Sequence, residues 1–418
     1  MEKLIIEGPS KLKGTVEISG SKNSSLPILA ATALFGEEYT IKNVPRISDV
    51  HTMLLLLETL GAEFSFYSND VHIDTRKISK WEAPYDLVKT MRASVVIWGA
   101  LLGRFGKAKI SLPGGCAIGD RPVDQHLKGF RALGHDTEIV SGYLESFTSN
   151  NTGGSYRFEI KTVTGTENLI LASIFAKSET VLYNCASEPE VLDLINFLSS
   201  LGAKITKTGG TIKIVPVSSL SKQNEPYCVI PDRIEAGTFL ALASLPGNDI
   251  EITKCAPDDL VSAIEAAEGV GSVVKLGDDS ISTHPADDLN SISLDTGPYP
   301  LFPTDLQAQF MSVLILAGGT SKIVENVFPN RFIHVAELRK LGAKISLDAN
   351  IASIVGVRRL TRASMQASDL RASASLLIGA LSASGRSEIH RVYHLDRGYE
   401  SIDNKLESLG AKIWRKNE

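Results

Sequence analysis

The sequence predicts an α/β fold in which two domains are each built from three repeats of roughly 70 residues. The first observation behind this prediction is the length, because 418 residues exceed what one hydrophobic core usually serves. The second is a recurring pattern, in which a helix-like stretch ends in Leu-Gly or a related pair and a short β-like run follows. The glycines of this pattern are 73, 68, 69, 71 and 68 residues apart, and they are Gly61, Gly134, Gly202, Gly271, Gly342 and Gly410.

Each repeat is predicted to hold a buried helix inside and strands outside. A glycine directly after a helix can adopt the left-handed conformation that ends it, so each Leu-Gly pair marks a helix C-terminus. The run after the fifth glycine, residues 343–347, alternates as a half-buried strand does. Upstream, each repeat carries an Ala-rich stretch that is apolar nearly all round and therefore belongs in an interior. The clearest of these stretches are residues 93–102, 168–175, 237–244, 309–317 and 372–381.

The six repeats divide into two domains at two predicted crossovers. The first domain is expected to comprise residues 21–229, and the second residues 1–20 together with 230–418. The polar stretch 218–226 and the segment 20–23 are the expected crossovers, and an N-terminal strand, about residues 3–18, is expected to complete the last repeat. A cleft beside such a hinge is a usual location for a ligand, and bound anions would close it.

Composition argues against several classes of protein. A net charge of −5 disfavours binding to nucleic acid or anionic membranes, which need a basic surface. No apolar run approaches the roughly 20 residues of a membrane helix, and acids within the first apolar run argue against a signal peptide. The cysteines show no spacing typical of zinc sites or disulfide frameworks, so a cytoplasmic protein is expected. They are Cys116, Cys185, Cys228 and Cys255.

Cys116 lies on a glycine-rich loop, residues 111–122, with Arg121 and Pro122 shortly after it. Gly114 and Gly115 permit backbone conformations that are closed to other residues, and prolines stiffen both ends of the loop. Such a loop can hold a thiol in solvent beside a charge that favours its reactive form. The loop alone also fits a surface turn with an incidental cysteine, so both interpretations stay open at this point.

Charged residues stand where several of the apolar helices begin. Lys22, Arg92 and Arg371 oppose the helix dipole there, so N-capping does not explain them, whereas a bound anion does. A net-acidic protein that gathers cations in this way is expected to bind a small polyanionic substrate. Asp305 precedes another apolar helix, where it is either an N-cap or a general base. Two further cations in the second half of the chain are Arg331 and Arg397.

Together these residues resemble a known family, the UDP-N-acetylglucosamine enolpyruvyl transferases. The shared motifs are residues 18–23, 84–94, 112–116, 302–305, 368–373 and 396–399, and the likeness extends from Leu4 to Lys412. The resemblance implies two inside-out α/β-prism domains, in agreement with the count of repeats. It also implies that the enolpyruvyl group of phosphoenolpyruvate is transferred to the 3′-hydroxyl of UDP-N-acetylglucosamine, which commits the sugar nucleotide to bacterial peptidoglycan. No metal or organic cofactor is implied.

The resemblance implies a role for each matching residue. Cys116 would protonate the methylene carbon of phosphoenolpyruvate, Asp305 would accept the proton of the sugar hydroxyl, and Asp369 would assist the later deprotonation. Phosphoenolpyruvate would be held by Lys22, Asn23, Arg121 and Arg397, in a charged cleft that Arg92 and Arg371 also line. We count Lys22 and Arg397 among the catalytic residues. The sugar nucleotide would contact Arg121, Pro122, Val123, Asp124, Gln125, Lys161, Thr162, Val163, Thr164, Gly165 and Val327.

Two alternative functions are weighed against this one. The 5-enolpyruvylshikimate 3-phosphate synthases share the fold and the reaction type, but they lack the thiol loop of residues 112–116. A paralogue that only binds a nucleotide sugar would need neither an acid nor a base. This chain retains the full set of Lys22, Cys116, Asp305 and Arg397, which favours the transferase.

Overall fold

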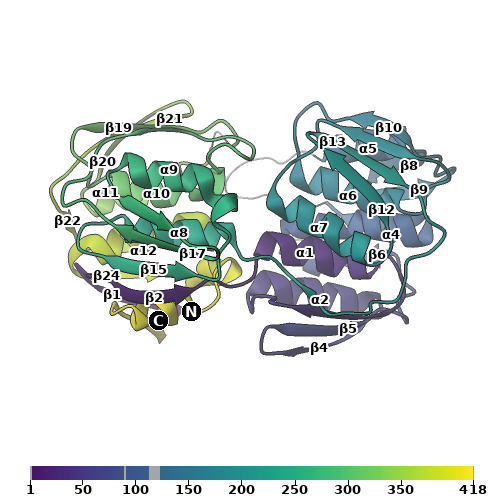
Figure 1. Cartoon of the computed structure of the whole chain (residues 1–418), viewed down its shortest axis with the longest axis horizontal. Coiled ribbons are helices and arrows are strands. Elements are labelled where there is room, and N and C mark those ends of the chain that lie inside the picture. The colour runs from purple at the N-terminus through teal and green to yellow at the C-terminus, as the bar shows by residue number, and fades with distance from the viewer. Residues whose placement is uncertain (1, 89–90, 113–122, 329, 418) are drawn as a thin grey trace. The chain divides into compact units, whose positions relative to one another are not determined.

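The computed structural model describes residues 2–88, 91–112, 123–328 and 330–417, and these form two compact units (Figure 1). Of the described residues, those up to Ser19 and from Pro231 onward form unit 1, and those from Gly20 to Ile230 form unit 2. Cys116, Arg121 and Pro122 lie outside the described residues, as does the side chain of Arg92. In the part of the chain that the structure describes, no helix has both the length and the apolar character needed to cross a membrane.

Unit 2 contains the first three repeats. The first consists of α1 (Lys22–Thr32), β3 (Glu38–Lys42), α2 (Ser48–Leu60), β4 (Glu63–Tyr67) and β5 (Asp70–Asp74). The second consists of β6 (Glu82–Ala83), α3 (Tyr85–Val88), the 3₁₀ helix η1 (Arg92–Val96), α4 (Ile97–Phe105), β7 (Lys107–Ser111), α5 (Asp124–Ala132), β8 (His135–Val140) and β9 (Tyr143–Thr148). The third consists of β10 (Gly154–Arg157), α6 (Val163–Ser173), β11 (Thr180–Tyr183), α7 (Pro189–Ser200), β12 (Lys204–Thr208) and β13 (Thr211–Val215), with β14 (Tyr227–Cys228) after it.

Unit 1 contains the other three repeats and the N-terminal strands β1 (Glu2–Gly8) and β2 (Lys13–Glu17). The fourth repeat consists of α8 (Arg233–Ala243), β15 (Asp249–Thr253), η2 (Pro257–Leu260), α9 (Val261–Gly269), β16 (Val273–Leu276) and β17 (Ser280–His284). The fifth consists of β18 (Ser293–Asp295), η3 (Thr304–Leu306), α10 (Gln307–Leu314), β19 (Thr320–Val324), α11 (Val335–Lys340), β20 (Lys344–Asp348) and β21 (Ile351–Val355). The sixth consists of β22 (Leu360–Thr361), β23 (Ser364–Gln366), α12 (Leu370–Ser382), β24 (Ala383–His390), η4 (Val392–Arg397), α13 (Ile402–Ser408) and β25 (Lys412–Asn417).

The described strands form six sheets, one for each repeat, and each combines antiparallel pairings with a parallel one. Unit 2 has the strand orders β14-β3-β5-β4, β6-β7-β9-β8 and β10-β11-β13-β12. Unit 1 has β16-β17-β15-β2, β18-β19-β21-β20 and β22-β24-β1-β25, with β23 also paired to β24. Parallel strands need a crossover connection between them. Here buried helices provide it, with α4 between β6 and β7, α6 between β10 and β11, α10 between β18 and β19, and α12 between β22 and β24.

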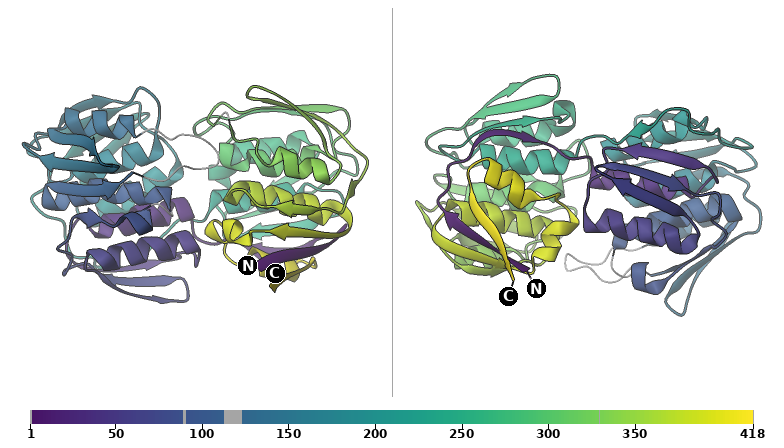
Figure 2. Two further views of the ribbon diagram at one scale, coloured as in Figure 1. Left: turned by 180° about the vertical axis from the view of Figure 1, so that it is seen from behind. Right: turned by 90° about the horizontal axis from the view of Figure 1, so that it is seen from below.

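The interior of each unit consists of helices, and the sheets lie outside them (Figure 2). In unit 2 the buried helices α4 and α6 pack closely, because a Cβ on Gly99 would lie only 2.2 Å from the carbonyl oxygen of Asn168. The amide of Asn168 stabilises this contact by accepting a 2.6 Å hydrogen bond from the Gly99 nitrogen. Helix α6 begins at Val163, five residues before the predicted start, while the predicted burial of these helices is confirmed.

The six repeat glycines end their helices as predicted. All of them have φ between +89° and +118°, in the left-handed region that only glycine adopts at low cost. In each case the glycine nitrogen donates a hydrogen bond to the carbonyl three residues earlier, as from Gly202 to Ser199 at 2.9 Å. The chain can then turn directly from helix to strand.

Two predictions about the chain path need correction. The N-terminal segment forms two strands, because Pro9 has no N–H to donate to a ladder. Strand β1 completes the sixth-repeat sheet as predicted, whereas β2 joins the sheet of the fourth repeat. The stretch 218–226 does not leave unit 2, since Gln223 exchanges hydrogen bonds of 2.6 and 3.2 Å with the backbone of Thr40 and β14 then pairs with β3.

Candidate active site

The residues predicted to bind or react lie mainly at the N-terminal ends of helices. Lys22 and Asn23 open α1, Asp124 opens α5, and Asp369 directly precedes α12. The first N–H groups of a helix have no partner within it, so these ends attract anions. The sequence therefore folds its candidate residues onto positions that already favour phosphate and carboxylate groups.

Lys22 is held in unit 2 by a buried ion pair. Its Nζ lies 2.6 Å from Oδ2 of Asp49, and the two side chains are only 9% and 5% exposed. Ser21 caps α1 by accepting a 3.2 Å hydrogen bond from the Ser24 nitrogen, which fixes the helix start. Sequence reasoning missed Asp49, although an acidic residue in the first turn of a predicted helix is a usable signal.

The predicted nucleotide contacts in unit 2 lie at the starts of two packed helices. At the start of α5, the side-chain oxygen of Gln125 accepts hydrogen bonds from Glu159 N at 3.0 Å and from Tyr156 Oη at 3.1 Å. The helix predicted for residues 168–175 leaves residues 161–165 outside it, but Thr162 is the N-cap of α6 and accepts a 3.2 Å hydrogen bond from the Gly165 nitrogen. Valine, threonine and glycine are weak helix formers, which explains why the pattern did not reveal this first turn.

A buried carboxyl group in unit 2 was also missed. Glu167, in α6, is 2% exposed, and its Oε1 has no hydrogen-bond partner among the described residues. Burial, and then the neighbouring Glu190 and Glu188, raise the pKa of Glu167 well above its usual value. The uncharged, protonated form of this carboxyl group is therefore favoured.

Asp305 contacts two other candidate residues of unit 1, Arg331 and Arg371. Its Oδ1 lies 2.7 Å from Nη1 of Arg331, and its Oδ2 accepts a 3.2 Å hydrogen bond from Nε of Arg371. The two arginine side chains are 6% and 2% exposed, whereas that of Asp305 is 26% exposed. Asp305 does not act as a side-chain cap, because Pro303 and Leu306 hold the cap positions of η3 and α10. Its geometry suits a carboxylate that is fixed on one side and accessible on the other.

A buried carboxylate, that of Glu325, holds the segment beside Asp305 in place. Glu325 is fully buried and accepts hydrogen bonds from the Thr304 hydroxyl at 2.8 Å and from the nitrogens of Val327 and Phe328 at 2.9 Å. Thr304 in turn accepts a 2.9 Å hydrogen bond from Nη1 of Arg331. Glu325 was not predicted as a site residue. It holds the backbone of Val327 directly, and through Thr304 it holds Arg331, the partner of Asp305.

Asp369 and Arg371 share the start of α12. Oδ1 of Asp369 accepts hydrogen bonds of 2.9 Å from the nitrogens of Arg371 and Ala372, so this aspartate is a helix cap as well as a candidate catalytic residue. Nη1 of Arg371 is buried and has no hydrogen-bond partner among the described residues, which leaves a donor for a bound anion. Arg397, at the end of η4, is near His394, whose pKa is lowered by burial and then by Arg391 and Arg397.

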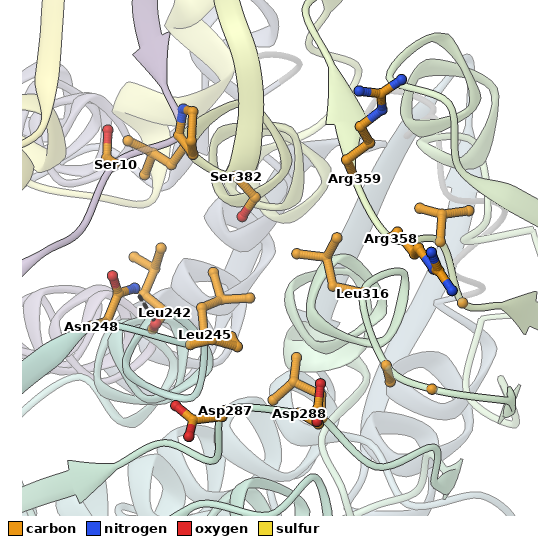
Figure 3. Close-up of a pocket in the computed structure, with 18 of the residues that line it drawn as sticks. Ser10, Leu242, Leu245, Asn248, Asp287, Asp288, Leu316, Arg358, Arg359 and Ser382 are labelled. Carbon is orange, nitrogen blue, oxygen red and sulfur yellow. Dashed lines mark hydrogen bonds between the residues drawn. The ribbon is translucent and has the colours of Figure 1, made fainter.

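The cavity in Figure 3 lies at the other end of the unit 1 helices. It has a volume of about 730 Å³ and is lined by Leu242, Leu316 and Ser382, at or just beyond the C-terminal ends of α8, α10 and α12. The candidate residues Asp305, Asp369 and Arg371 stand at N-terminal ends. The cavity is therefore separate from the candidate active site.

Known proteins resemble this chain over nearly its whole length. A sequence model of the EPSP synthase (3-phosphoshikimate 1-carboxyvinyltransferase) family matches residues 6–406. The UDP-N-acetylglucosamine 1-carboxyvinyltransferases of Dichelobacter nodosus and Geotalea uraniireducens are 48% and 46% identical to this chain, and each match covers 100% of both proteins.

Solved structures show the same fold. The enolpyruvyl transferase NikO from Streptomyces tendae is 25% identical with a TM-score of 0.89, and the match covers 100% of this chain and 99% of NikO. An EPSP synthase from Acinetobacter baumannii covers 100% of both chains with a TM-score of 0.74 at 14% identity, which is a likeness of fold alone. The predicted fold of two inside-out α/β domains is thereby confirmed.

Proposed function

Because the chain belongs to the EPSP synthase (3-phosphoshikimate 1-carboxyvinyltransferase) family, we propose that it is an enolpyruvyl transferase acting on phosphoenolpyruvate and UDP-N-acetylglucosamine. The observation that carries the proposal is the 46–48% identity to UDP-N-acetylglucosamine 1-carboxyvinyltransferases over the whole chain. Identity to a shikimate-pathway EPSP synthase of the same fold is only 14%. The product is the 3′-enolpyruvyl ether of the sugar nucleotide, and phosphate is released.

The proposed reaction is an addition followed by an elimination. In the addition, the 3′-oxygen of the sugar bonds to C2 of phosphoenolpyruvate, its proton passes to Asp305, and Cys116 donates a proton to C3. In the elimination, the C2–O bond to phosphate breaks and C3 loses a proton with the help of Asp369, which restores the double bond. Support for the base comes from the two buried arginines that fix the Asp305 carboxylate while part of it stays exposed.

The remaining candidate residues are proposed to hold the two anionic substrates. Lys22 and Asn23 would bind phosphoenolpyruvate together with Arg121 and Arg397, and the buried Lys22–Asp49 pair supports this by fixing the lysine at the start of α1. The nucleotide would bind the starts of α5 and α6, where N–H groups are available. The acid and the base are both side chains, so the proposed chemistry needs no metal or organic cofactor. We place the reaction in the bacterial cytoplasm, at the start of peptidoglycan synthesis.

A phosphate-release assay tests the proposal. Phosphate is expected only when phosphoenolpyruvate and UDP-N-acetylglucosamine are both present. Asp305→Asn should lower kcat by about 100-fold or more, as loss of a general base does. Asp295→Asn, which alters an exposed aspartate in β18, should leave kcat unchanged. Equal turnover with shikimate 3-phosphate in place of the sugar nucleotide would contradict the assignment.

A further inference from the structure

The hydroxyl of Tyr399 stands where three buried helices of unit 1 meet. Tyr399 is 2% exposed, and its Oη lies 2.8 Å from the Thr238 hydroxyl of α8 and 3.1 Å from Nε2 of Gln309 of α10. From α12, the Arg371 guanidinium lies over the tyrosine ring with Cζ 5.3 Å from its centroid. The Tyr399 side chain thus contacts three buried helices, and the N-terminal ends of two of them, α10 and α12, carry candidate residues.

The direction of each hydrogen bond in this group is fixed by its neighbours. Thr238 donates its proton to the carbonyl of Ile234 at 2.8 Å, so its oxygen must accept from Tyr399. Because the tyrosine donates its own proton to Thr238, its oxygen is left to accept from Nε2 of Gln309, which can only donate. Burial raises the pKa of Tyr399, so the phenol stays protonated and this pattern persists at neutral pH.

Gln309 and Arg371, which contact Tyr399 from α10 and α12, also hold Asp305 in place. Nε2 of Gln309 donates a 2.8 Å hydrogen bond to the main-chain carbonyl of Asp305, and Nε of Arg371 donates to its carboxylate at 3.2 Å. A Gln309 oxygen in that place would repel the carbonyl, which fixes the orientation of the amide. The Tyr399 hydroxyl is therefore linked to the backbone of Asp305 through one intervening residue, Gln309, while the Tyr399 ring contacts the arginine that binds the Asp305 carboxylate.

We propose that Tyr399 is a positioning residue for the enolpyruvyl transfer, which aligns Arg371 and Gln309 so that they present the Asp305 carboxylate in its reactive orientation. This role rests on the proposed function, because that function makes Asp305 the base. Tyr399 does more than fill the core, because a phenylalanine would fill the same space and keep the contact between ring and guanidinium. Only the hydroxyl can accept from Gln309, and it acts through that residue without touching a substrate.

Tyr399→Phe removes the hydroxyl alone and is the first test. We expect kcat to fall about 10- to 100-fold, the usual effect of a slightly misplaced catalytic group, while KM for both substrates stays within about threefold. The matched control is Tyr39→Phe in unit 2, where a tyrosine that is also 2% exposed donates to the Phe35 carbonyl at 2.8 Å. The control should keep the wild-type kcat. A wild-type kcat in Tyr399→Phe would overturn the proposal.

A double-mutant cycle separates positioning from a general loss of stability. If the Tyr399 hydroxyl acts through Gln309, the loss of kcat on Tyr399→Phe is expected to be several-fold smaller when Gln309→Met is already present. Losses of kcat that simply multiply would contradict the coupling. A wild-type protein that releases no phosphate with this substrate pair would refute the proposed function itself. An active wild type with an unaffected Tyr399→Phe variant would refute only the positioning role.

Discussion

The three cysteines that the structure describes all have a raised pKa. Burial raises the pKa of Cys185 to about 12 and that of Cys255 to about 11, and partial desolvation together with the nearby carboxylates of Asp193 and Asp70 raises the pKa of Cys228. Because the thiolate is the reactive form, these three cysteines are poor nucleophiles at neutral pH.

An epoxide analogue of phosphoenolpyruvate should therefore alkylate Cys116. We expect peptide mass spectrometry to place the adduct on Cys116, and Cys116→Ala to bind both substrates but lose turnover. Cys228 is exposed, so Cys228→Ala serves as the matched control and should be labelled like the wild type. An adduct on Cys228 in the wild-type protein would contradict the assignment.

Single residues of the candidate site could be predicted from the sequence only where local pattern marks them. Lys22 and Asp305 were identifiable because a charge at the start of an apolar helix needs an explanation. Asp49, Glu325 and Tyr399 were not, because their roles depend on partners from other elements. Tyr399, for example, meets Thr238, which is 161 residues away in the chain. Periodicity and capping rules carry no information about such distant contacts.

At the scale of elements, the repeat glycines offer a matched pair for measurement. Gly134 and Gly202 have φ of +89° and +94°, so alanine is strained at both positions. A Cβ at Gly202 would meet its nearest neighbour at 3.4 Å, whereas one at Gly134 would lie 2.0 Å from the Asn150 carbonyl oxygen.

Gly202→Ala should lower the free energy of unfolding by about 1 kcal/mol, the cost of the left-handed conformation. Gly134→Ala adds a backbone clash to this cost and should destabilise by at least about 3 kcal/mol. Urea denaturation of both variants measures the difference. Equal losses of unfolding free energy in the two variants would show that the backbone near Asn150 can move away without cost, which would contradict its close packing against Gly134.

Helix ends were predicted better than helix starts. Each end carries a glycine, which is a strong local signal, and all six have the expected conformation. The start of α6 was predicted five residues late because Val163, Thr164 and Gly165 favour helix weakly. Burial of these residues against neighbouring elements outweighs their propensity, and this contribution is visible only in the folded structure.

At the scale of the whole molecule, three buried histidines link stability to pH. His126, His135 and His334 are at most 3% exposed, and burial lowers the pKa of each to about 4. In the unfolded chain these groups take up protons near pH 6.5. The contribution of these histidines to the free energy of unfolding is therefore complete above about pH 6.5 and is lost as the pH falls towards 4.

The free energy of unfolding should decrease by about 2 kcal/mol for each of these histidines between pH 7.5 and pH 5. Urea denaturation at the two pH values checks this expectation. His135→Gln should make the decrease smaller, whereas His72→Gln, which alters an exposed histidine, should not. An unchanged stability at pH 5 would contradict the buried neutral state of the imidazoles.

The overall fold could be predicted because the same pattern of helix and strand recurs six times in the sequence. What the sequence did not reveal is an exchange of strands at the crossovers. Strand β2 leads into α1 of unit 2 but pairs with β15 in unit 1, and β14 leads into α8 of unit 1 but pairs with β3 in unit 2. Both strands are short, with five residues in β2 and two in β14, so their composition does not indicate which sheet they join.

The pairing of β1 with β24 and β25 has a consequence for biosynthesis. The ribosome makes β1 long before its partner strands β24 and β25, whereas every strand of unit 2 has been synthesised once Ile230 has been added. Unit 2 can therefore fold during translation, while unit 1 must await β24 and β25. Throughout that interval the apolar run Leu4, Ile5 and Ile6 has no partner strand. The charges of Lys3 and Glu7 and the proline that follows protect this exposed edge from pairing with other nascent chains.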